Sequence, residues 1–287
     1  MTVAAPGPET AFSDAAFAER AVYLPTVDAL VVADLHVGRD EASAVSLPLG
    51  ERADLVDRLG ALLDRFDPGT VAVAGDVVHT FDRVSDGALD TLNSLRDRCG
   101  ANDAAFELVA GNHDTALASA WDGRVREELV LGGADDRDAA GVGGDPSDAS
   151  ASPDASASPD ATDAPRTVVC HGHEAPATAA DRYVIGHVHP TIEIEGDRRP
   201  CSLVGAGTHR GADVLTLPAF TRLAAGVPVN DAPRTGLDSP LLADPAALAP
   251  VVYDPRGDAD GGDGDADAGD SGATLRFPPL GEFRELL

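Results

Sequence analysis

The stretch Ala29-Leu30-Val31-Val32-Ala33-Asp34-Leu35-His36 shows the pattern that decides the fold: a short apolar run ends in two side chains that can bind metal. Four later runs end in the same way, in the clusters Gly75-Asp76, Gly111-Asn112-His113-Asp114, His171-Gly172-His173 and Gly186-His187-Val188-His189. Such β-branched runs predict strands buried on both faces of a sheet that helices cover. Each cluster is therefore expected at the C-terminal end of a strand, where an α/β sheet gathers residues that are distant in sequence.

Helical patterns separate the first three of these strands. Residues 48–66 and 85–98 place leucines at helical spacing, with Ser85 as the expected N-cap of the second helix. This alternation predicts parallel strands joined by crossovers. Residues 21–24 and 29–33 are expected to form an opening hairpin or a pair of adjacent strands. After His189 the pattern changes, and short β runs predict antiparallel strands of a second sheet over 191–194, 202–204 and 213–217.

Composition separates a core from its additions. Residues 132–165 and 257–272 consist almost entirely of small, acidic and Pro residues, and they are expected to be disordered. The expected organisation is an N-terminal extension over 1–20, a domain over 21–242 that contains the acidic insertion, and a C-terminal segment over 243–287.

The net charge is −28, and all 21 basic residues are Arg. An acidic chain without Lys suggests a halophilic source, where acidic surface holds water and counter-ions. At low salt such a surface would repel nucleic acid, but a saline interior would screen the charges within a few ångströms. Three cysteines without a CxxC spacing make a disulfide scaffold improbable, and no run reaches the length of a membrane span. A cytoplasmic protein that does not interact with membranes is expected.

The clusters supply enough donors for two metal ions. A carboxylate can bridge two cations, which leaves about three further protein ligands for each metal and an open position for water and substrate. The candidate ligands are Asp34, His36, Asp76, Asn112, His171, His187 and His189. Imidazole, carboxylate and amide donors suit manganese first, and iron, zinc, cobalt or nickel next, better than magnesium or calcium.

This ordered set resembles the calcineurin-like metallophosphoesterase superfamily, whose motifs run D-x-H, G-D, G-N-H-D/E, H and G-H-x-H. The residues around the motifs, such as Val37-Gly38, Val77-Val78-His79 and the later Leu217-Pro218-Ala219-Phe220, are similar to a small archaeal branch related to the nuclease subunit of the SbcCD complex, and to phosphoesterases encoded beside bacterial DNA ligases. The resemblance implies an α/β (α+β) fold, a two-sheet β-sandwich flanked by helices, here with disordered acidic insertions.

The resemblance also implies a role for each residue. Asp34, His36 and His189 would hold one metal, Asn112, His171 and His187 the other, and Asp76 would bridge them. Hydrolysis would use a hydroxide between the metals, with His113 as the general acid that protonates the leaving alkoxide. Asp114 would fix the ring of His113.

Several assignments stay open from the spacing. His171 directly follows its strand and is preferred as the ligand, but His173, two residues later, is the alternative. His79 either lines the pocket or lies in a solvated loop, His209 is expected to be structural, and Arg39 is expected to pair with a nearby acid rather than to bind phosphate.

Three functions fit these residues. The first is a phosphodiesterase or nuclease acting on nucleic acid or a nucleotide, and the second is a phosphatase for a small metabolite or nucleotide, because no basic patch or aromatic platform for bases is apparent. The third is an interaction module without turnover. An enzyme is favoured, because such a module has no need of His113 and Asp114.

Overall fold

The run that sets the sequence pattern forms strand β3 (Ala29–Val32), which lies inside a six-stranded sheet. The structure is a computed structural model that describes residues 11–43, 49–133, 164–255, 257 and 272–283. The sheet has the order β1-β2-β3-β4-β5-β6, and the other strands are β1 (Ala16–Ala18), β2 (Ala21–Leu24), β4 (Thr70–Ala74), β5 (Ala105–Val109) and β6 (Val125–Arg126). Strands β3 to β6 are parallel, whereas β2 and β3 form the expected antiparallel pair.

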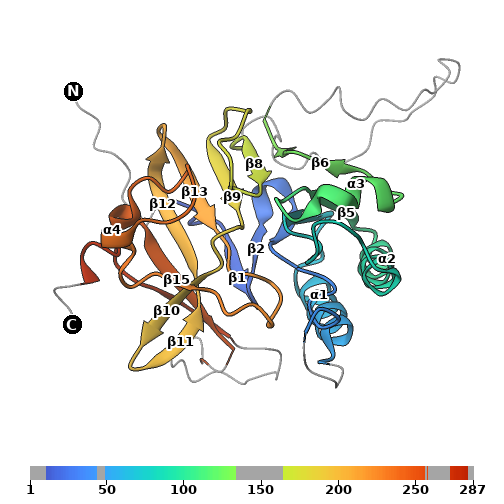
Figure 1. The fold of residues 1–287 in the computed structure, drawn as a ribbon. Coiled ribbons are helices and arrows are strands. Elements are labelled where there is room, and N and C mark those ends of the chain that lie inside the picture. Colours follow the sequence, from blue (N-terminus) through green and yellow to red (C-terminus); the bar gives the residue numbers. More distant parts are fainter. Residues whose placement is uncertain (1–10, 44–48, 134–163, 256, 258–271, 284–287) are drawn as a thin grey trace, which may run out of the picture.

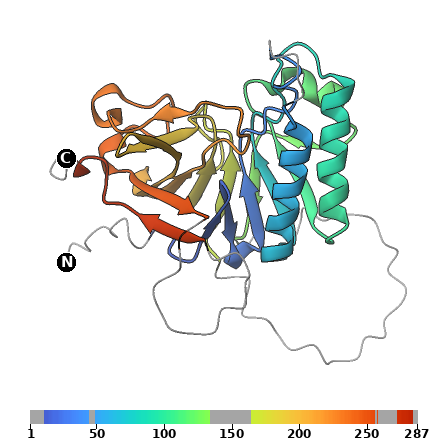
Figure 2. The same cartoon turned by 90° about the horizontal axis from the view of Figure 1, so that it is seen from below.

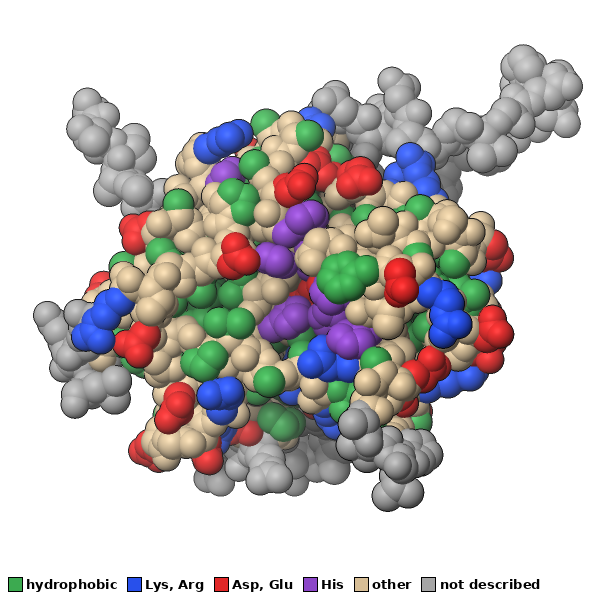
Figure 3. Space-filling view, viewed as in Figure 1, with side chains coloured by type: hydrophobic (Ala, Val, Ile, Leu, Met, Phe, Trp, Pro, Cys, Tyr) green, Lys and Arg blue, Asp and Glu red, His purple; other side chains and the backbone are tan. Residues whose placement is uncertain are grey.

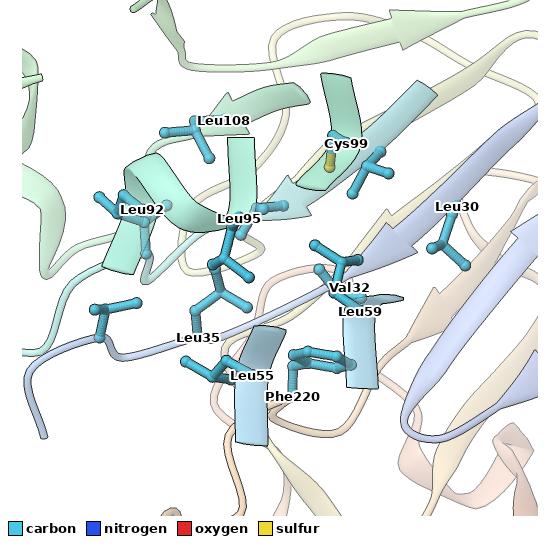
Figure 4. Packing of buried hydrophobic residues seen from close by; sticks show 14 of the residues in the cluster. Leu30, Val32, Leu35, Leu55, Leu59, Leu92, Leu95, Cys99, Leu108 and Phe220 are labelled. Carbon is cyan, nitrogen blue, oxygen red and sulfur yellow. The ribbon is translucent and has the colours of Figure 1, made fainter. Parts of the chain in front are cut away.

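Two long helices cover one face of this sheet (Figures 1 and 2). They are α1 (Glu51–Phe66) and α2 (Asp86–Gly100), close to the predicted ranges. The hydroxyl of Ser85 accepts the N–H of Ala88 at 3.0 Å, which confirms the N-cap. Leu30 and Val32 alternate with their neighbours along β3 and point toward the helices, where they share a buried cluster with helix leucines such as Leu59 (Figure 4). Shorter helices are η1 (Pro25–Val27), η2 (Asp114–Ala116) and α3 (Leu117–Ala120).

A second sheet packs against the other face of the first. Its seven strands have the order β16-β15-β12-β13-β9-β8-β7, with bounds β7 (Leu129–Leu131), β8 (Thr167–Cys170), β9 (Arg182–Ile185), β12 (Ser202–His209), β13 (Ala212–Thr216), β15 (Ala249–Asp254) and β16 (Ala273–Arg276). Val31 and Ala72 of the first sheet share a buried cluster with Val184 and Leu215 of the second. The structure is therefore a two-sheet sandwich flanked by helices, as predicted.

A small third sheet covers the outer face of the second sheet. It has the order β11-β10-β14, with β10 (Pro190–Ile194), β11 (Asp197–Pro200) and β14 (Val227–Pro228), and short helices α4 (Ala232–Thr235) and η4 (Pro245–Ala247) follow it in the chain. Ile192 from this layer is buried with Val214 of the second sheet. The prediction that residues 191–194 share a sheet with 202–204 and 213–217 was thus wrong, because β10 pairs with β11 and β14 instead.

The sheets extend beyond the range 21–242 that was expected for the domain. Strand β1 precedes residue 21 and pairs with β2, while β15 and β16 follow residue 242 and complete the second sheet. Most of the two acidic stretches, over 134–163 and 258–271, lies outside the described residues. Cys99, Cys170 and Cys201 are free and buried. Among the described residues, none of the helices has the length and apolar character that crossing a membrane requires.

Candidate metal centre

The five clusters meet where two sheets face each other. Strands β3, β4 and β5 of the first sheet lead into residues 34–36, 75–76 and 111–114, whereas β8 and β9 of the second sheet lead into 171–173 and 186–189. Because the strands are parallel within each group, their C-terminal ends lie at a common edge. The expected placement after strand ends is confirmed, but the single rim of one sheet is replaced by two adjoining rims.

Backbone conformation marks these loops as constrained. Asp34, His36, Asp76, His187 and His189 all have positive φ angles, between 44° and 68°. This region is unfavourable for residues with a side chain, and such residues persist where the surroundings hold them. Backbone hydrogen bonds from Asp34 N to Gly75 O at 3.1 Å and from His36 N to Asp76 O at 2.9 Å join the first two loops.

Two glycines are required by close packing against the donors. A Cβ on Gly75 would lie 2.2 Å from Nδ1 of His171, and a Cβ on Gly111 would lie 2.2 Å from Oδ1 of Asp76. Gly75 also has a φ of +79°. The glycines of these motifs therefore let side chains from other loops reach the centre.

One group of donors consists of Asp34, His36, Asp76 and His189, whose ligand atoms all lie within 4.8 Å of one another. His36 Nε2 is 3.3 Å from His189 Nε2 and 3.7 Å from Asp76 Oδ2, and His189 Nε2 is 3.3 Å from Asp34 Oδ1. Asp34, His36 and Asp76 are buried. This group matches one of the two expected ligand sets together with the expected bridging residue.

The second group forms around the ring of His171. Its Nε2 lies 3.0 Å from Asn112 Oδ1, 3.2 Å from His187 Nδ1 and 3.3 Å from Asp76 Oδ1. The structure thus brings Asn112, His171 and His187 together, and His171 faces the other oxygen of Asp76. His173 lies at the edge of this group, with its ring 5.2 Å from that of His171 and 6.0 Å from that of His187. Its side chain is one-third exposed, and its Nε2 lies 3.9 Å from Glu174.

Burial is the largest cause of the pKa shifts in the centre. Burial, followed by the charge of Asp34, raises the pKa of Asp76 to about 7, whereas burial lowers the pKa of His36 to about 3 and that of His171 to about 4. Burial alone would raise the pKa of Asp34, but the hydrogen bond and charge of His189 bring it below its usual value. At neutral pH His36 and His171 are therefore neutral, which is the form that binds metals.

This donor set fits two divalent cations. Nitrogen and oxygen lone pairs converge from both groups, and the facing imidazole nitrogens lie 3.2 Å to 3.3 Å apart. Neutral imidazoles, carboxylates and one amide oxygen are ligands that transition metals accept.

His113 lies beside this centre with its two ring nitrogens in different surroundings. Nδ1 is 2.8 Å from the carbonyl oxygen of His79, and Nε2 is 3.8 Å from Asp76 Oδ2. The backbone N–H of His113 donates to Asp76 Oδ1 at 3.1 Å. One nitrogen is therefore held by the backbone, and the other faces the metal centre.

Asp114 has a different role from the expected one. Its carboxylate does not hold the ring of His113 but accepts backbone N–H groups, from Gly111 at 2.8 Å, Val77 at 3.0 Å and Val78 at 2.9 Å. It ties the loop after β4 to the loop after β5. The carbonyl of His79 orients the ring of His113 instead, and a backbone contact of this kind leaves no mark in the sequence.

The structure shows which of the remaining histidines lie in the site. His79 lies in the site, because its ring is 5.7 Å from that of His36 and 6.0 Å from that of His113. His209 is buried edge-to-face against Tyr183, 5.5 Å between ring centroids, as expected of a structural residue. Phe81, which the sequence analysis did not single out, stacks on His113 with ring centroids 3.9 Å apart. Its only sequence signal was an aromatic residue five positions after Asp76.

The centre opens onto the surface of the protein. Histidine side chains gather at the middle of one face, with hydrophobic side chains beside them (Figure 3). An open hollow next to His187 is lined by Val227, Leu237 and Asp238. The centre is thus accessible to a substrate from outside.

Comparisons with known proteins agree with this architecture. A model of the calcineurin-like phosphoesterase family matches residues 28–191, a range that contains all five clusters. A crystal structure of the Pseudomonas putida nuclease MPE is similar in fold, with a TM-score of 0.51 and 22% sequence identity over 82% of this chain and 88% of that chain. None of the curated proteins matches the chain.

Proposed function

Because the chain belongs to the calcineurin-like phosphoesterase family and is therefore a hydrolase, we propose that it cleaves phosphodiesters with two divalent metal ions. The observation that carries this proposal is the position of Asp76: Oδ2 faces His36 Nε2 at 3.7 Å, and Oδ1 faces His171 Nε2 at 3.3 Å. One carboxylate thus serves both donor groups. The proposed ligands of the first ion are Asp34, His36 and His189, those of the second are Asn112, His171 and His187, and Asp76 is shared.

The residues of the chain divide the chemistry between them. Two divalent ions, when bound, supply an ionised water near neutral pH and neutralise charge on the phosphate oxygens. The water oxygen forms a bond to phosphorus while the bond to the leaving oxygen breaks. His113 in its protonated form donates from Nε2 to that leaving oxygen, and the His79 carbonyl accepts from Nδ1–H and keeps the ring in place.

The presence of His113 favours phosphate esters with poor leaving groups. An alkoxide leaves slowly unless it is protonated, so a positioned acid beside the centre is most useful for esters of sugars and nucleosides. The Pseudomonas putida protein of similar fold is a nuclease, which supports nucleic acid as the first substrate class. The relation to the archaeal branch and to the SbcCD nuclease subunit is part of this proposal, and so is the choice of manganese as the native metal.

A metal-by-substrate screen in high salt tests the proposed function. The metal-free protein is supplied with Mn²⁺, Zn²⁺, Co²⁺, Ni²⁺ or Mg²⁺ and assayed on bis-para-nitrophenyl phosphate, para-nitrophenyl phosphate, cyclic nucleotides and single- and double-stranded DNA. We expect hydrolysis of the diesters, strongest with Mn²⁺, and loss of at least about 10²-fold in Asp76→Asn because both donor groups lose a shared ligand. Asp57→Asn, which changes an exposed acid on α1, is the matched control and should stay active.

Two results would replace the proposal. Hydrolysis of the monoester alone would indicate a phosphatase for a small metabolite or nucleotide. An absence of hydrolysis with every metal, in a protein that still binds two ions, would indicate an interaction module on the same fold.

A further inference from the structure

Phe81 is a large apolar side chain in an unusual place. It follows β4 by seven residues, and 51% of it is exposed, the highest value among the large hydrophobic residues that the structure describes as exposed. A single exposed hydrophobic residue is ordinary on a protein surface. Phe81 differs because its ring stacks on that of His113, with the centroids 3.9 Å apart and the planes 27° from parallel.

We propose that Phe81 determines substrate specificity by stacking on the unpaired base of the nucleoside that leaves during hydrolysis. This inference rests on the proposed function, in which His113 protonates the leaving oxygen. A ring in contact with His113 lies on the side of the site where the leaving group departs. One face of Phe81 is occupied by His113, and the exposed remainder is free to meet a planar partner.

The charge of the protein favours stacking over ionic contacts. With a net charge of −28, the surface repels a polyanion, and high salt would weaken contacts between Arg side chains and phosphates. Stacking of a base on an aromatic ring needs no net charge, and every base offers a π face. A base within a duplex is already stacked on its neighbours, so the ring selects single-stranded ends or small nucleotide diesters.

Three dinucleotides with one phosphodiester test the proposal: thymidylyl-thymidine, and two analogues in which the base is missing from one nucleoside or from the other. The position of the phosphate in the released nucleotide, 3′ or 5′, identifies the leaving side. With Mn²⁺ in high salt, we expect kcat/KM of the wild type to fall about tenfold when the leaving-side base is missing, and to change little when the other base is missing.

Variants then separate stacking from an effect on His113. In Phe81→Ala, kcat/KM on the full dinucleotide should be about tenfold below that of the wild type, whereas kcat/KM on the leaving-side abasic analogue should equal that of the wild type. Phe81→Tyr keeps an aromatic ring and should retain the preference for the full dinucleotide. Leu275→Ala, which truncates another exposed apolar residue on the edge strand β16, is the control and should resemble the wild type.

Two outcomes overturn this inference while the proposed function stands: equal rates of the wild type on all three dinucleotides, or an equal loss of Phe81→Ala on all three. The second would mean that Phe81 only positions His113. If the wild type cleaves neither the dinucleotides nor bis-para-nitrophenyl phosphate, the proposed function itself fails.

Discussion

The imidazole of His113 has one nitrogen against a backbone carbonyl and the other toward the carboxylate of Asp76. This arrangement suits proton transfer at Nε2, so we expect His113→Ala to reduce kcat on alkyl phosphodiesters by about 10²- to 10⁴-fold. The loss on para-nitrophenyl esters should be much smaller, because para-nitrophenolate leaves without protonation. Metal content, measured by elemental analysis, should not change.

A matched control for this variant is available in the same protein. His173→Ala removes a histidine that is one-third exposed and lies outside the proposed ligand set, with its ring 5.2 Å from that of His171 and 6.0 Å from that of His187, and it should keep its activity on both kinds of ester. Undiminished hydrolysis of an alkyl phosphodiester by His113→Ala would remove His113 from the role of acid.

The choice between His171 and His173 leads to a second prediction at this scale. His171 Nε2 is within 3.3 Å of Asn112, His187 and Asp76, whereas His173 is one-third exposed. We expect His171→Ala to retain about one ion per chain and His173→Ala about two, measured by elemental analysis after dialysis against trace Mn²⁺. The reverse pattern would make His173 the ligand.

The sequence predicted the positions of the ligands but not the contacts that orient His113. The seven expected ligands meet in the structure because each lies in the loop that follows a strand, and strand ends are readable from apolar runs. The contacts of Asp114 and His113 with backbone groups were not readable, because they depend on the path of loops after β4 and β5. The position of Phe81 depends on the same path.

At the scale of elements, α1, α2 and the strands between them follow from local periodicity, and they appear close to the predicted bounds. The sheet to which a strand belongs is not a local property. Strands β8 and β9 have the same apolar pattern as β3 and β4 but lie in the other sheet, and β10 joins a third sheet. Pairing partners depend on long-range contacts that a single run of residues does not encode.

The first residue of α1, Glu51, holds the loop that contains His36 through hydrogen bonds to its backbone. The buried carboxyl of Glu51 accepts the N–H of Gly38 at 2.8 Å and of Arg39 at 3.2 Å, two and three residues after His36. Burial raises the pKa of Glu51 from 4.5 to about 7. The folded protein therefore binds a proton here more tightly than the unfolded chain does.

This shift predicts how Glu51 affects stability as a function of pH. Its contribution is fully present below pH 4.5 and is lost as the pH rises to about 7, because the unfolded carboxyl ionises first. The free energy of unfolding of the wild type minus that of Glu51→Gln should thus fall by up to about 3 kcal/mol over this range. Denaturant titrations with a chelator at each pH measure it. Titrating groups that do not interact with Glu51 cancel in the difference, whereas Asp40, whose hydrogen bond and charge also raise the pKa of Glu51, titrates together with it. Parallel curves would contradict the assignment.

At the scale of the whole molecule, the site depends on two sheets packed face to face. Ala72 and Ala74 of β4 lie in the core between the sheets, and their small side chains allow the rims of β4 and β8 to approach each other. Asp76 follows one rim and His171 the other, 3.3 Å apart at Oδ1 and Nε2. The centre therefore exists only while the sandwich is intact, and conditions that loosen the packing should also release metal.

Because the protein carries a large net charge, a low salt concentration is the condition most able to loosen the packing of the two sheets. A folded chain with 49 acidic and 21 basic residues concentrates negative charge that the unfolded chain spreads out, and salt screens this repulsion. We expect the melting temperature of the metal-free protein to fall by about 10 °C between 3 M and 0.2 M KCl, equivalent to roughly 6 kcal/mol for a chain of this size. Sucrose should raise the melting temperature to a similar extent at both salt concentrations and leave the difference between them if screening is the cause, since it acts through exclusion from the surface. Equal stability at both salt concentrations would contradict the prediction of a halophilic source.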